Sequence, residues 1–160
     1  MIWLLGAIAL STALSLRHSL QTCDILHVEY VAPGTPSYHL RFVRLASRAG
    51  VVSDIGLHIF SDDPRAELWY YPDEGSAPHI SLISSTDPTA RGWHAEPDGG
   101  VRPHGSATLV AMRDDLTIWQ TSPSSRSIAP LYLIVPELGE VYKNTARYWP
   151  AAFVRRGCLR

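Results

Sequence analysis

The sequence predicts an all-β domain: an antiparallel β-sandwich or barrel of about eight short strands, with room for one short helix near the C-terminus. Three observations support this fold class. Apolar and polar residues alternate over short runs, which is the period of strands buried on one face. Segments rich in Pro, Gly and Asp separate the runs. No long stretch has apolar residues at helical spacing.

Eight strands are predicted along the chain. Residues 25–31 alternate, with Leu26, Val28 and Tyr30 on one face, and residues 38–44 alternate in the same way. Further strands are predicted at residues 57–60, 67–71, 79–84, 107–112, 116–121 and 131–135. Six side chains are expected to face inward: Phe60, Trp69, Leu82, Leu109, Ile118 and Leu133.

Two connections have a more specific expectation. Arg113, Asp114 and Asp115 separate two apolar runs and predict a hairpin. Residues 136–147 carry apolar side chains at spacings of three and four and begin with a proline, which the first turn of a helix tolerates. The one predicted helix is placed there.

An apolar, uncharged run occupies residues 2–16 and ends at Arg17. Its length suits the core of a signal peptide and is short for a membrane span. We therefore divide the chain into a signal peptide or N-terminal membrane anchor (1–16) and a single β-rich domain (17–160). A buried core helix is disfavoured because the run has no polar stripe.

The two cysteines, Cys23 and Cys158, lie near the two ends of the predicted domain. An even number of cysteines behind an export signal predicts a disulfide between them. One alternative is lipid attachment to Cys23, which would leave Cys158 without a partner. Another is two free thiols in a cytosolic protein, which requires that residues 2–16 are not a leader.

The predicted location is outside the cytoplasm. Lys143 is the only lysine among 14 basic residues, a bias associated with GC-rich bacterial genomes. Together with the leader, this favours a bacterial protein in the periplasm or outside the cell, or held at the inner membrane if the leader is not cleaved. A net charge of -1 provides no overall attraction for nucleic acid.

No motif assigns catalysis, a metal or a cofactor. The chain lacks a Gly-x-Ser-x-Gly elbow, a His-Glu-x-x-His helix, a phosphate-binding glycine loop and a Cys-x-x-Cys pair. His27 and Glu29 would share a strand face and could approach His39 on a neighbouring strand. Exposed polar residues on a solvated sheet face are the simpler interpretation.

Aromatic residues offer the best candidates for a ligand or partner surface. Trp69 and Tyr71 fall on one side of a strand whose other side is also apolar, so one face is either covered or left exposed. Trp93 and His94 lie in the long loop 85–106. That loop, with the neighbouring turn 72–78, is the predicted location of the surface.

The sequence favours a binding or interaction module for an unknown protein, glycan or small molecule. One alternative is a small periplasmic hydrolase with a dispersed site, in which His79 or His94 acts as base beside Ser84, Ser85 or Asp87. A second alternative is a structural accessory of an envelope complex, held at the membrane by an uncleaved leader.

Overall fold

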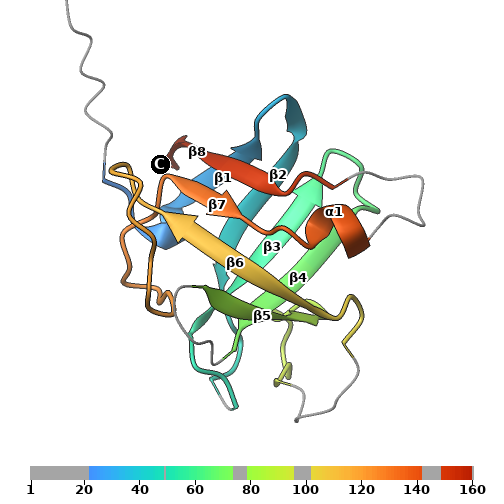
Figure 1. Ribbon diagram of the computed structural model, residues 1–160. Helices are drawn as coiled ribbons and strands as arrows, with labels where there is room; N and C mark the ends of the chain where they lie inside the picture. The colour runs from blue at the N-terminus through green and yellow to red at the C-terminus, as the bar shows by residue number, and fades with distance from the viewer. Residues whose placement is uncertain (1–21, 49, 74–78, 96–101, 142–148, 160) are drawn as a thin grey trace, which may run out of the picture.

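The computed structural model describes residues 22–48, 50–73, 79–95, 102–141 and 149–159. Eight antiparallel strands follow one another around a closed barrel, and the last strand pairs with the first (Figure 1). The strands are β1 (Val28–Ala32), β2 (Thr35–Arg44), β3 (Ile55–Ser61), β4 (Glu67–Pro72), β5 (Ile80–Ser85), β6 (Ser106–Met112), β7 (Tyr132–Ile134) and β8 (Ala152–Cys158). The all-β prediction is confirmed, with the barrel as its architecture.

Two short helical segments accompany the barrel, the 3-10 turn η1 (Ile25–His27) and α1 (Leu138–Val141). The helix predicted within 136–147 is therefore described over four residues; residues 136–137 form a turn before it, and residues 142–147 lie outside the described residues. The leader 1–16 also lies outside them. No helix in the described ranges has both the length and the hydropathy needed to span a membrane.

Apolar side chains fill the interior of the barrel. Every second residue of β3 (Ile55, Leu57 and Ile59) is fully buried, and Leu68 and Tyr70 of β4 point to the same interior. A barrel of eight strands has an interior just wide enough for side chains to fill. The barrel is therefore a packed core, and its ends and outer wall are the surfaces that remain for binding.

Three of the six predicted inward residues are confirmed and three are wrong. Leu82, Leu109 and Leu133 are fully buried in the barrel interior. Phe60 and Trp69 lie on the opposite side of their strands from the residues that fill the barrel interior, and Ile118 is 40% exposed. β3 and β4 carry large apolar side chains on both faces, so their alternation alone does not identify the inner face.

The hairpin predicted around residues 113–115 forms only in part. Arg113 N donates to Thr117 O at 3.0 Å, and a single bridge joins Met112 to Ile118. Residues 116–121 then leave the sheet, so the strand predicted there is absent, and β6 pairs with β7 instead. β8, for which no strand was predicted, closes the barrel between β7 and β1.

The predicted disulfide is confirmed. Cys23 precedes β1 and Cys158 ends β8, with 5.5 Å between their Cα atoms. Because β1 and β8 are hydrogen-bonded neighbours, the disulfide lies across the seam at which the barrel closes. The seam brings the described N-terminal segment close to the C-terminus (Figure 1).

Connections between antiparallel strands alternate between the two ends of the barrel. The β2–β3 and β6–β7 connections therefore lie at the same end as both described chain termini. This region, the termini end, includes residues 22–24, 45–48, 50–54, 113–131 and 159. Ala129 N donates to Cys23 O at 2.8 Å, and Ser125 N donates to the Asp54 carboxylate at 2.8 Å, so hydrogen bonds join these segments.

Candidate functional site

Four rings form a stack on the outer wall of the barrel. Their order is His39 of β2, Phe60 and His58 of β3, and Trp69 of β4, and we call this set the ring ladder. Successive ring centroids are 5.1, 4.6 and 3.7 Å apart, with interplanar angles of 15°, 25° and 3°.

Strand register explains the ring ladder. His39 is paired with Phe60, and His58 with Trp69, so their outward side chains project from neighbouring points of the sheet. Neighbouring strands are about 4.8 Å apart, which allows outward rings to stack face to face. The rings therefore turn their faces toward one another.

Charged side chains surround the ring ladder. The Arg41 guanidinium lies 5.1 Å from the Phe60 ring centroid, and Arg41 Nε donates to Glu29 Oε1 at 3.0 Å. The two ring nitrogens of His39 lie 3.5 Å from Glu29 and 3.4 Å from Asp62. The stack is thus a half-buried aromatic centre with a rim of both charge signs.

The mixed site considered around His27, Glu29 and His39 forms only in part. Glu29 and His39 meet, whereas His27 belongs to η1 and is exposed, with Asp24 3.8 Å away. Within the described ranges, no three His, Cys, Asp or Glu side chains are arranged to hold a metal ion.

The four predicted surface residues lie in different environments. Trp69 is half-buried in the ring ladder, and His94 is exposed. Tyr71 is only 3% exposed, in a second apolar cluster with Leu45 and Ile83 on the outside of the barrel. Trp93 packs edge-on against Tyr71, with 5.5 Å between ring centroids, so Tyr71 is a packing residue.

The side chains considered for a hydrolase hold the β5–β6 connection in place. Ser84 Oγ accepts a hydrogen bond from His104 N, and Ser85 Oγ accepts one from Trp93 Nε1, each at 2.9 Å. Asp87 accepts hydrogen bonds from the amide and hydroxyl of Thr89. Parts of the predicted surface, residues 74–78 and 96–101, lie outside the described residues.

Burial lowers the pKa of His58, although a hydrogen bond to Glu67 at 3.1 Å and the nearby Asp87 act in the opposite direction. Arg41 also lowers this pKa. In the folded protein His58 therefore remains neutral to a lower pH than in the unfolded chain, where its pKa is near 6.5.

This difference predicts a pH-dependent stability. Below about pH 6.5 the unfolded chain binds the His58 proton more readily than the folded protein does, so stability falls as the pH is lowered. We expect His58→Gln to reduce the loss of unfolding free energy between about pH 7.5 and pH 5.5, measured by urea denaturation. His94→Gln, at an exposed histidine, is the matched control. An equal loss in the wild type and His58→Gln would contradict the assignment.

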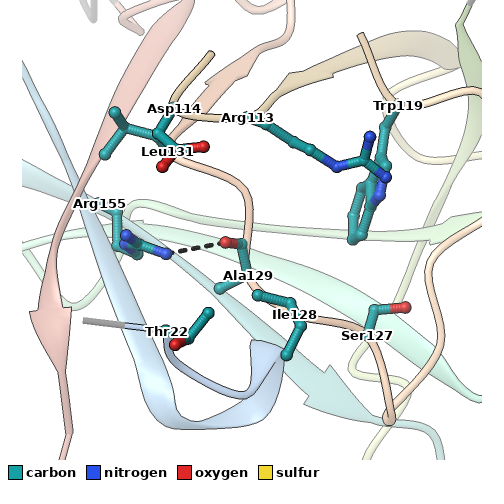
Figure 2. Close-up of a pocket in the computed structure, with 9 residues that line it drawn as sticks. All are labelled: Thr22, Arg113, Asp114, Trp119, Ser127, Ile128, Ala129, Leu131 and Arg155. Carbon is teal, nitrogen blue, oxygen red and sulfur yellow. Dashed lines mark hydrogen bonds between the residues drawn. The ribbon is translucent and has the colours of Figure 1, made fainter. Parts of the chain in front are cut away.

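A cavity of about 420 Å³ opens at the termini end (Figure 2). Trp119, Leu131 and Ile128 contribute apolar surface to it, and Arg113 and Arg155 contribute guanidinium groups. Arg155 Nη1 donates to Ala129 O at 2.8 Å, and Asp114 contributes a carboxylate to the same lining (Figure 2). This combination suits an amphiphilic ligand that carries negative charge.

Comparison with protein-family models, with curated proteins and with solved structures finds no match to this chain.

The central members of the ring ladder, His58 and Phe60, were not among the predicted surface residues. An available signal was the position of His58 between the apolar residues Leu57 and Ile59, which places it on the opposite face of the strand. The register that pairs His58 with Trp69 cannot be predicted from the residue pattern of one strand.

Proposed function

We propose that this chain is an exported binding module that recognises a protein partner through the ring ladder and its charged rim. The disulfide between Cys23 and Cys158 is compatible with an exported protein. Because the barrel interior is filled, a partner has to be bound on the outer wall or at an end. The proposed location is the bacterial periplasm or the cell exterior, with the chain held at the inner membrane if residues 2–16 are retained.

The observation that carries this proposal is the four-ring stack on the outer wall. Aromatic residues and arginine are enriched at the centres of protein interfaces, and polar residues surround them. The ring ladder with Arg41 over Phe60 has this composition.

A protein partner fits the ring ladder better than a glycan does. Sugars stack on an exposed aromatic face, and the faces of His58 and Phe60 are occupied by neighbouring rings. The edges of aromatic rings carry partial positive charge and suit carbonyl groups or aromatic faces of a partner. Glu29 and Arg41 can add charge-assisted contacts at the rim.

The test uses charge reversal at Arg41, whose side chain is 45% exposed. Immobilised wild-type protein is used to capture a partner from an envelope extract of the source cells, and the purified partner is then titrated against variants. We expect Arg41→Glu to weaken the Kd at least about tenfold, because it removes the guanidinium that lies over Phe60 and places a like charge beside Glu29.

Arg102→Glu is the matched control, because Arg102 is exposed beside β6, away from the ring ladder. It should leave the Kd within about twofold of wild type, since a charge outside the interface contributes little to affinity. Equal affinities of wild type and Arg41→Glu would contradict the proposal, as would failure of the wild-type protein to capture any partner.

A further inference from the structure

Large apolar side chains are exposed at only one end of the described barrel. The residues concerned are Val52, Leu116, Ile118, Ile128 and Leu159, and all belong to the termini end or directly follow β8 there. Leu116 is 65% exposed and Ile128 is 52% exposed. Single exposed apolar residues are common, but their concentration at one end indicates a contact surface.

Leu116 is exposed despite a conformational cost. Its φ of 65° lies in the left-handed region, where it is the only non-glycine residue among those described. The hydrogen bonds from Arg113 N to Thr117 O and from Leu116 N to Arg113 O hold this turn. Gly, Asn or Asp would adopt the conformation more readily, and packing within the barrel does not explain a leucine at this tip.

The cavity at the same end adds groups that suit a phospholipid headgroup layer. Arg113, Trp119 and Ile128 line this cavity together with the carboxylate of Asp114 (Figure 2). Tryptophan and arginine are favoured at the boundary between hydrocarbon and water, and a guanidinium binds phosphate through charge-assisted hydrogen bonds. Apolar tips beside such groups are typical of surfaces that bind membranes from one side.

Chain connectivity favours the membrane as the occupant. Thr22 lines the cavity, and only residues 17–21 separate it from the apolar run 2–16. An extended chain covers at most about 3.5 Å per residue, so the distance from Leu16 to Thr22 is at most about 20 Å. If the run 2–16 stays in a bilayer, this short connection holds the termini end at the headgroup layer.

We propose that the chain retains residues 2–16 as an anchor and that the termini end of the barrel contacts the phospholipid surface. Leu116, Ile118 and Ile128 enter the headgroup layer, and Arg113 binds lipid phosphate. This contact is independent of the ring ladder, which lies on the outer wall of β2, β3 and β4. It predicts a fixed orientation of the barrel relative to the membrane.

The test uses the full chain in vesicles of phosphatidylethanolamine and phosphatidylglycerol that contain a photoactivatable phospholipid. After illumination, lipid adducts are mapped by mass spectrometry. We expect adducts in residues 113–119 and 126–129, and none in the β1–β2 and β3–β4 turns at the opposite end, residues 33–34 and 62–66. Adducts in residues 2–16 report that the anchor is in the bilayer.

Leu116→Asp combined with Ile128→Asp should lower adduct formation in residues 113–119 and 126–129 by roughly tenfold, because each side chain loses its gain from apolar burial. Adducts in residues 2–16 should remain unchanged. Arg65→Asp, at an exposed position of the opposite end, changes the net charge by the same amount and should have no effect.

Several results would overturn the proposal. These are adducts confined to residues 2–16, adducts distributed equally over both ends, and adduct yields that the double variant leaves unchanged. Circular dichroism of each variant checks that the barrel remains folded, and a single variant, Ile128→Asp, replaces the double variant if the latter does not fold.

Discussion

Replacing Cys23 and Cys158 together by alanine is expected to lower the free energy of unfolding by about 5 kcal/mol. The two residues are 135 positions apart, and closing a loop of this length removes much of the conformational entropy of the unfolded chain. Domains of this size are stable by about 5–15 kcal/mol, so the loss is a large share of the total. Urea denaturation of the oxidised wild type and the double variant measures it.

The matched control for this prediction is wild-type protein treated with a reductant. It should unfold at the same urea concentration as the double variant, because both lack the covalent connection. A double variant within about 1 kcal/mol of the oxidised wild type would contradict the expected contribution of the disulfide.

Tyr30→Ala is expected to destabilise the barrel by about 3–5 kcal/mol, the usual cost of truncating a buried aromatic side chain. Tyr30 is fully buried and packs edge-on against Phe42, with 6.1 Å between ring centroids. Its hydroxyl donates to Pro130 O at 2.9 Å, and burial raises the pKa of this hydroxyl. Urea denaturation at neutral pH provides the measurement.

Tyr30→Phe separates the packing of the ring from the hydrogen bond. It keeps the ring and leaves the Pro130 carbonyl without this donor, which should cost about 1–2 kcal/mol. The alanine variant should therefore be clearly less stable than the phenylalanine variant. Equal destabilisation by the two substitutions would show that filling the interior is not the main contribution of Tyr30.

Most of the sheet could be predicted from local patterns because its strands alternate and end at turn residues. β8 was missed because Arg155 and Arg156 are consecutive and the register of β8 shifts against Glu29 and Tyr30 of β1. Residues 116–121 have the pattern of a strand but are drawn out of the sheet by the turn at Leu116. Whether β8 and residues 116–121 join the sheet depends on pairing with strands that are distant in sequence.

The candidate site was predictable only in part. Trp69 was recognised as ambiguous because both faces of its strand are apolar, and the structure places it outside the barrel interior. Tyr71 appeared equivalent in the sequence, yet the β5–β6 connection covers it with Trp93. The alternation of apolar and polar residues in a strand does not predict whether a distant loop will pack over it.

The disulfide across the barrel seam makes the polypeptide between Cys23 and Cys158 a covalent ring. A protease that cuts one exposed connection would therefore open the ring without releasing a fragment. The product would have the topology of a circular permutant, with new ends at the cut and the original first and last strands still joined. In an extracytoplasmic environment rich in proteases, a single cleavage would leave all eight strands in one covalent unit.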